Sequence, residues 1–182
     1  MKLEAGRATQ LADDDLSRKR AGTFRVLGID PGSQVTGYGV VEKVKSKLVW
    51  VTHGEIRPGR GALLTQCLET IYDGVREQIR ISAPDALAIE DIFYGKNVRS
   101  LIKQGHVRGG AILAGRRMGI PVFQYSPLEI KHAVVGYGRA EKEQVQKMIK
   151  AILSLPALPP ADAADALAVA VCHLHFLKAD PI

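Results

Sequence analysis

The sequence predicts an α/β domain built on a mixed five-stranded sheet with helices on both faces. Two apolar runs, residues 24–30 and 86–90, each end in an acidic residue and are typical of buried strands. Between and after them, apolar residues recur at helical spacing. This alternation favours an α/β domain, in which ligands bind at the rim of the sheet where the strands end.

The first three strands are expected to be sequential and antiparallel, over residues 24–30, 36–43 and 47–56. A Pro-Gly turn stops the first strand, and the third is rich in β-branched and aromatic residues. Gly37 and Gly39 interrupt the second strand, which predicts a hairpin whose backbone can pass close to a ligand.

Two helices are predicted before the fifth strand. A Pro-Gly break at residues 58–61 precedes a helix of about 20 residues that starts near Leu64, and a second helix covers residues 98–118. The second helix contains several glycines, among them Gly105 and Gly109. Because each interior glycine costs about 1 kcal/mol relative to alanine, something is expected to pack closely there, either the sheet or a second subunit.

The last third of the chain predicts one short strand and three helices. Residues 121–125 form the strand, and a capping box at Ser126 starts a helix that runs to about Val135. A basic helix over residues 139–154 follows, and an apolar helix covers about 162–177.

Bulk composition limits the functional classes. The chain has 182 residues and a formal net charge of +6, which suits an anionic partner such as nucleic acid. Its two cysteines indicate reduced thiols of a cytoplasmic protein, and neither a membrane span nor a secretory signal is predicted. We expect a disordered extension at 1–23, one folded domain at 24–178 and a short tail at 179–182.

Four acids carry the predicted chemistry. Asp30 and Glu90 end strands, while Asp162 and Asp165 share a face in the first turn of the last helix. Each acid alone is more often structural, since acids also cap helices, but together they indicate a site. Carboxylates without a Cys/His cluster favour Mg²⁺, with Mn²⁺ as a substitute. Two such ions roughly 3.5–4 Å apart can stabilise the attacking and leaving oxygens of a phosphoryl displacement.

Basic and aromatic residues flank these acids. Such residues clamp phosphates and stack on bases, although single lysines also occupy solvated helix faces. The candidate phosphate and DNA contacts are Phe93, Lys96, Arg99, Lys103, Lys131, Arg139 and Lys142.

Two other functions fit part of the pattern. The opening strand and its glycines resemble the phosphate-binding hairpin of actin-like ATPases and sugar kinases, which need two domains around the nucleotide. A non-catalytic DNA-binding module is the second alternative, and it would have no use for four acids facing its ligand's phosphates.

An ordered set of motifs over about residues 25–176 resembles the RuvC family of Holliday junction resolvases. The set comprises Leu27-Gly28-Ile29-Asp30-Pro31-Gly32-Ser33, Thr36-Gly37-Tyr38-Gly39-Val40, Ala88-Ile89-Glu90 with Phe93 and Lys96-Asn97, Lys131 with Val134-Val135-Gly136, Ala140-Glu141-Lys142, and Ala161-Asp162-Ala163-Ala164-Asp165-Ala166-Leu167-Ala168. The extension before Thr23 departs from the family pattern.

The resemblance implies an RNase H-like fold and a homodimer with two active sites. It implies Mg²⁺-dependent, paired nicks in opposing strands of a four-way DNA junction, which leave ligatable 5′-phosphates during recombination and repair. It also implies partnership with a junction-binding tetramer and a hexameric branch-migration motor.

By the same resemblance, individual residues acquire roles. Asp30, Glu90, Asp162 and Asp165 match the family's catalytic acids. Lys131 and Lys142 match lysines implicated in catalysis, and Phe93 matches an aromatic that stacks on bases. The helix with Gly105 and Gly109 matches the dimer-interface helix. Asp91, beside Glu90, is not assigned to the ligands from sequence alone.

Overall fold

The computed structural model describes residues 22–92 and 98–176. Apart from Gly22 and Thr23, the predicted extension at 1–23 and the tail at 179–182 lie outside the described residues.

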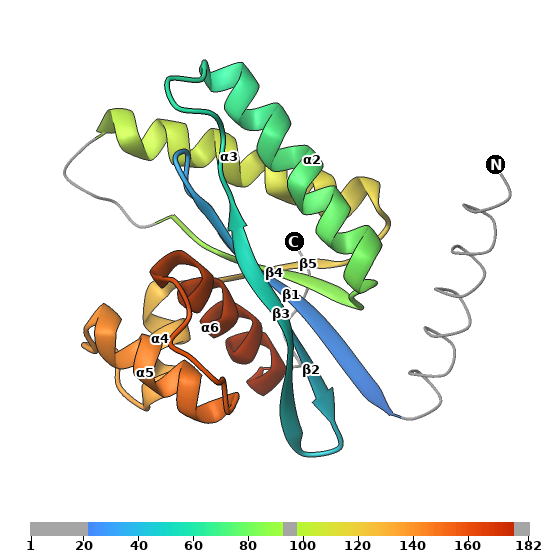
Figure 1. Ribbon diagram of the computed structural model, residues 1–182, viewed down its shortest axis with the longest axis vertical. Helices are drawn as coiled ribbons and strands as arrows, with labels where there is room; N and C mark the ends of the chain where they lie inside the picture. The colour runs from blue at the N-terminus through green and yellow to red at the C-terminus, as the bar shows by residue number, and fades with distance from the viewer. Residues whose placement is uncertain (1–21, 93–97, 177–182) are drawn as a thin grey trace, which may run out of the picture.

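A mixed five-stranded sheet forms the centre of the domain, as predicted (Figure 1). Its strands run in the order β3-β2-β1-β4-β5, and β1 is the middle strand. This strand pairs antiparallel with β2 and parallel with β4, so the ends of β1 and β4 meet at one edge of the sheet. The bounds are β1 Thr23–Asp30, β2 Thr36–Val44, β3 Lys47–Ile56, β4 Ala86–Glu90 and β5 Val122–Tyr125.

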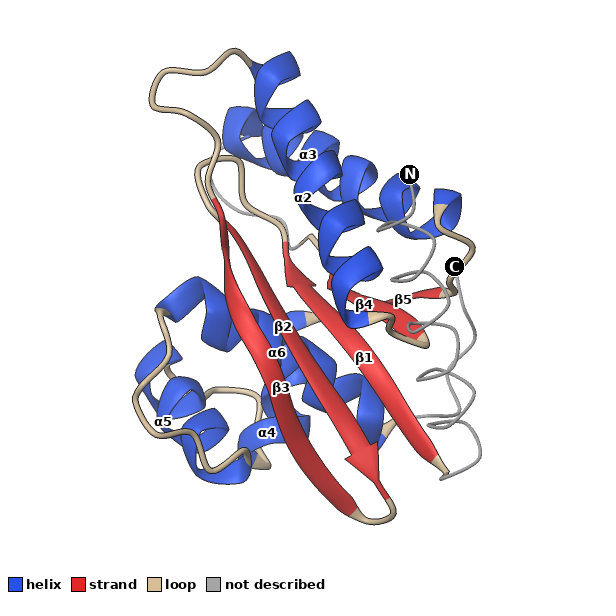
Figure 2. Ribbon diagram, turned by 45° about the vertical axis from the view of Figure 1, so that its right-hand side comes forward, coloured by secondary structure: helices blue, strands red, loops and turns tan. Residues whose placement is uncertain are grey.

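Helices cover both faces of the sheet (Figure 2). On one face, α2 (Leu64–Ser82) and α3 (Val98–Arg117) enclose a core with the inward side chains of β1, β2 and β4. The opposite face carries α4 (Pro127–Val135), α5 (Lys142–Ile152) and α6 (Ala161–His175). In α6, most residues are buried, because the helix lies between the sheet and its two neighbours.

The basic helix differs from its predicted bounds. It begins at Lys142 rather than 139, since Gly136 ends α4 with a left-handed backbone (φ 83°) and a loop intervenes. Glu141 is the N-cap of α5, and its backbone N–H donates to Gln144 Oε1 at 2.9 Å. Lys142 therefore stands at the very start of the helix, and Arg139 lies in the preceding loop.

The glycines of α3 have different surroundings at the two ends of the helix. A Cβ at Gly115 would lie 2.8 Å from a methyl of Val122, so this glycine allows α3 to pack on the sheet. Near Gly109 and Gly110, no described atom lies within 4 Å of where a Cβ would be. The sheet accounts for Gly115, and the middle of α3 presents an open, small-residue surface.

Within the described ranges, no helix is long and apolar enough to cross a membrane. Cys67 and Cys172 are both free thiols, as the sequence predicted.

Candidate active site

Three elements bring the four predicted acids to one edge of the sheet. Asp30 is the last residue of β1 and Glu90 the last of β4, and the parallel register of Ile29 with Ile89 sets the two acids side by side. Asp162 and Asp165 project from the first turns of α6, which lies across β1 and β2. All four acids are half-buried.

The close approach of α6 depends on glycines in the sheet. A Cβ at Gly28 would lie 2.7 Å from the backbone nitrogen of Ala170, and one at Gly39 would lie 2.8 Å from that of Leu167. At Gly37, a Cβ would overlap the backbone carbonyl of Asp162. Side chains at these positions would push α6, and the acids that it carries, away from Asp30. The glycines were expected to let the backbone pass close to a ligand, whereas the segment that approaches Gly37 and Gly39 in the structure is α6.

Burial and like charges perturb the two strand acids. Burial, followed by the charges of Glu90 and Asp165, raises the pKa of Asp30 from 3.8 to about 8. Burial also raises the pKa of Glu90, although its side-chain hydrogen bond with Asp30 acts in the opposite direction. The pair therefore binds a proton more tightly than an exposed acid does. Strongly perturbed carboxyl pairs of this kind are concentrated at functional sites.

Both predicted lysines are in electrostatic contact with the acids. Lys142 Nζ lies 2.8 Å from Asp165 Oδ2, and this hydrogen bond raises the pKa of Lys142, with smaller contributions from Asp30 and Asp162. The charge of Lys131, from α4, favours the ionised form of Glu90. Lys142 thus stays positively charged beside Asp165.

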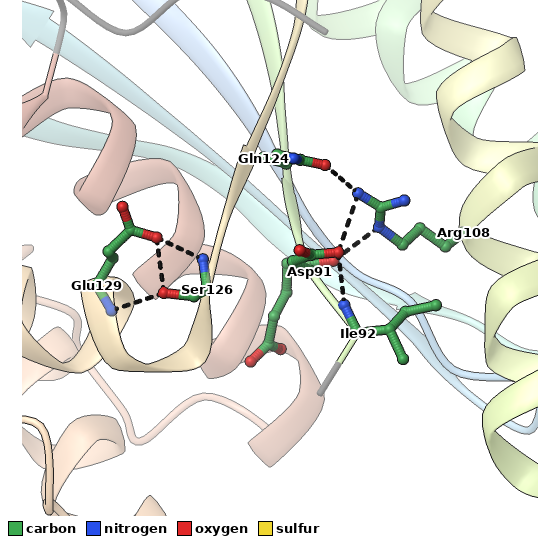
Figure 3. A network of polar contacts seen from close by, with 7 residues as sticks. Asp91, Ile92, Arg108, Gln124, Ser126 and Glu129 are labelled. Carbon is green, nitrogen blue, oxygen red and sulfur yellow. Dashed lines mark hydrogen bonds and ion pairs between the residues drawn. The ribbon is translucent and has the colours of Figure 1, made fainter. Parts of the chain in front are cut away.

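The carboxylate of Asp91 points toward Arg108 of α3 (Figure 3). Its carboxylate is 3.3 Å from Arg108 Nη2 of α3, and its Oδ1 accepts a hydrogen bond from the backbone N–H of Ile92 at 2.8 Å. Arg108 also donates to Gln124 of β5 and, at 3.4 Å, to the carbonyl of Glu90. Asp91 is thus a structural acid, and Arg108 ties α3 to the ends of β4 and β5 around Glu90.

Sequence reasoning did not identify Arg108, because its partners lie 16 to 18 positions away and no local pattern marks it. Of the predicted DNA contacts, Arg99, Lys103 and Arg139 are exposed, the first two on the first turns of α3. Phe93 and Lys96 lie outside the described residues.

The oxygen atoms of the four carboxylates are ligands of the kind that a hard divalent cation prefers. Burial, and after it the charges of neighbouring carboxylates, raises the pKa values of Asp30 and Glu90, and a bound cation would favour the ionised form of both groups. In the present arrangement a bound proton and the Lys142 ammonium offset the charge. Over the described ranges, no group of three or more His, Cys, Asp or Glu residues is arranged to hold a metal ion.

Comparison with known proteins places this chain in a family. The family model described as "Crossover junction endodeoxyribonuclease RuvC" matches residues 26–173. Proteins of that description from Syntrophotalea carbinolica and Geobacter metallireducens are 50% and 51% identical over 152 residues. These matches cover 84% of this chain, and 94% and 93% of the relatives.

A solved structure agrees with the sequence matches. The structure titled "T. thermophilus RuvC in complex with Holliday junction substrate" superimposes with a TM-score of 0.81 at 32% identity, covering 87% of this chain and 99% of that one. A yeast mitochondrial Holliday junction resolvase has a TM-score of 0.63 at 14% identity, which supports the fold alone. The predicted RNase H-like fold is thus confirmed, and the chain belongs to the RuvC family of crossover junction endodeoxyribonucleases.

Proposed function

We propose that this chain resolves four-way DNA junctions by hydrolysing one phosphodiester in each of two opposing strands at the acid cluster. The observation that carries the proposal is the convergence of Asp30 and Glu90, from adjacent strand ends, with the Asp165–Lys142 pair. Membership of the RuvC family makes a junction the expected DNA substrate.

The four acids would hold two Mg²⁺ ions, for which Mn²⁺ would substitute. When bound, such ions supply Lewis-acid stabilisation of the attacking and leaving oxygens of the phosphodiester. Asp30 must give up its proton to act as a ligand, because only the carboxylate offers full ligand strength. Ion binding is therefore coupled to proton release at this residue.

Lys142 and Lys131 would interact with the phosphate being cut. Lys142 is 75% exposed while its partner Asp165 is 20% exposed, so the ammonium can reach a DNA phosphate without leaving the cluster. Its raised pKa keeps it charged at neutral pH. Lys131 approaches from the side of Glu90. Both roles are electrostatic stabilisation of charge on the phosphoryl oxygens.

A homodimer would present two such sites to one junction. A four-way junction has approximate two-fold symmetry, so a two-fold dimer can place identical sites on opposing strands. The outer face of α3 fits the interface: Ile102, Gly109 and Leu113 lie on one stripe, and both apolar side chains are exposed. Paired, symmetric nicks would leave 5′-phosphates that a ligase can seal.

The cellular setting follows from the substrate. The enzyme would act on chromosomal DNA in the cytoplasm, beside a junction-binding tetramer and a hexameric branch-migration motor.

The test compares a synthetic four-way junction with a linear duplex of the same sequence in Mg²⁺. We expect paired, ligatable nicks in the junction alone. Asp30→Asn, Glu90→Gln and Asp162→Asn should each abolish cleavage while junction binding survives, since the basic surface stays intact. Asp73→Asn, a matched change at an exposed acid of α2, should cut normally. Equal cleavage of junction and duplex would contradict junction selectivity, and normal cleavage by a site variant would remove that acid from the site.

A further inference from the structure

A basic cavity lies beside the acid cluster, at the same edge of the sheet. Its volume is about 600 Å³, within the range of ligand sites. Residues 33–35 of the loop after Asp30 form one wall, the connection from β3 to α2 forms another, and Lys103 of α3 contributes a third. None of the catalytic acids lines this cavity, so it is distinct from the active site.

Every charged residue that lines the cavity is basic: Arg57, Arg60 and Lys103. Arg57 Nε donates to Glu55 Oε2 at 3.0 Å, which fixes the direction of the guanidinium while the side chain stays 61% exposed. Among the described residues, Arg60 and Lys103 have no ion-pair partner, and both are exposed. Two uncompensated cations thus converge on one cavity.

The backbone around the cavity also favours an anion. Helix α2 begins here at Leu64, with no acidic side chain in its first turn to offset the positive end of its dipole. Gly59 and Gly61 line the cavity without side chains, so a ligand can approach the backbone closely.

A rigid turn connects the cavity to Asp30. Thr36 is fully buried, and its hydroxyl donates to the carbonyl of Gly32 at 2.8 Å and accepts from the Gly32 N–H at 3.3 Å. These bonds close the loop that carries Ser33 and Gln34 into the cavity. A group bound in the cavity is therefore held at a fixed position relative to the end of β1.

We infer that this cavity binds a backbone phosphate of the junction strand that runs past the active site, through Arg57, Arg60 and Lys103. The inference rests on the proposed function and assigns a role to two arginines that no sequence motif marks. Because no acidic residue lines the cavity, a metal ion is a poor occupant. Since Arg60 and Lys103 touch none of the four acids, the subsite orients the substrate and takes no part in the chemistry.

The first experiment measures junction binding against salt concentration in the Asp30→Asn background, which prevents cleavage. Removing one phosphate-bound cation should make the slope of log K against log [salt] shallower by about 1. We expect this for Arg60→Ala and a larger change for Arg60→Ala with Lys103→Ala. Lys47→Ala is the matched control, because Lys47 is exposed at the opposite end of the sheet. A slope for the Arg60 variants equal to that of Lys47→Ala would overturn the inference.

Cleavage kinetics distinguish a substrate-binding role of Arg60 from a structural one. With Asp30 intact, Arg60→Ala should raise KM for junction cleavage and leave kcat within about twofold, because the acid cluster is untouched. A fall in kcat without a rise in KM would overturn the assignment. If the unmodified protein neither binds nor cuts a junction, the proposed function fails and this inference with it. Normal cutting with an unaltered KM in Arg60→Ala would remove the subsite alone.

Cys67 provides a probe inside the cavity. It is 9% exposed and lines the cavity, whereas Cys172 is fully buried and burial raises the pKa of its thiol to about 12. Saturating junction DNA should slow alkylation of Cys67 by N-ethylmaleimide in Asp30→Asn, and the protection should weaken when Arg60→Glu is added. Protection by inorganic phosphate at constant ionic strength, with none from the junction, would identify a free-anion site and contradict the inference.

Discussion

Gly37 of β2 lies directly against the backbone of Asp162 at the start of α6. A Cβ on Gly37 would overlap the Asp162 carbonyl group, and neither partner is a flexible side chain that could move aside. The distance between the sheet and two of the four clustered acids is thus set by the absence of a side chain.

We therefore expect Gly37→Ala to impair cleavage more than folding. The added methyl should displace the first turn of α6, lower junction cleavage by at least about tenfold and raise the Mg²⁺ concentration needed for half-maximal rate, at a folding cost of about 1–3 kcal/mol. Metal titrations of the rate and thermal unfolding measure these effects. Gly54→Ala is the control, since its Cβ would meet only the ring end of Tyr38. Equal metal requirements in the two variants would contradict the prediction.

The raised pKa of Asp30 predicts a pH-dependent stability without divalent ions. Between pH 3.8 and about 8 the folded state binds a proton at Asp30 that the unfolded state has lost, so the free energy of unfolding falls as pH rises through this window. Asp30→Asn cannot ionise and should be more stable than the unmodified protein at pH 9, by about 1 kcal/mol or more, roughly 2–4 °C in Tm. Thermal unfolding of both proteins in the presence of a chelator, from pH 5 to 9, measures this difference. Plots of Tm against pH that run parallel for the two proteins would refute the prediction.

Lys142→Ala should slow cleavage and weaken its dependence on salt. The variant leaves Asp165 without its 2.8 Å partner and removes the cation nearest the acids. Single-turnover rates across a salt series should fall at every concentration, with a slope shallower by about 1. Lys142→Arg should recover part of the rate, because it keeps the charge. Lys147→Ala, on the same helix, is the control, and a salt slope that matches it would make Lys142 a bystander.

A bulky residue on the open face of α3 should separate the proposed dimer. Gly109→Trp places a large side chain where no described atom lies within 4 Å, so the subunit fold should survive. Sedimentation should show a shift towards monomer, with loss of paired nicking and single nicks remaining. Arg76→Trp, on the exposed face of α2, tests whether any surface tryptophan shifts the protein towards monomer. A stable dimer of Gly109→Trp would place the interface elsewhere.

Much of this fold could be predicted because its strands carry clear signals. A strand with an apolar run that ends in an acid buries its middle residues and leaves the acid at the rim of the sheet. The order of residues alone therefore predicts β1 and β4. The capping box at Ser126 likewise marked the start of α4, and Glu129 Oε2 accepts from the Ser126 backbone N–H at 2.7 Å (Figure 3). Local chemistry determines both features, and both predictions are confirmed.

Other features depend on contacts between distant segments. The ion pair of Asp91 with Arg108 joins the end of β4 to the middle of α3. Lys142 and Asp165, 23 positions apart, meet because α5 packs on α6. Arg60 lies within the predicted chain break at 58–61, and it lines the cavity with Arg57 because the loop after Asp30 lies beside them. No residue pattern encodes such distances before the chain folds.

The direction of β1 has a practical consequence for experiments on this protein. The strand starts at Thr23, paired with Val44 near the tip of the β2–β3 hairpin, and reaches the edge with the acid cluster only at Asp30. At about 3.3 Å per residue, its first residue lies roughly 25 Å from that edge. An affinity tag or fluorophore attached ahead of Thr23 is therefore joined to the domain far from the acid cluster, which makes this the preferred point for surface immobilisation and single-molecule labelling.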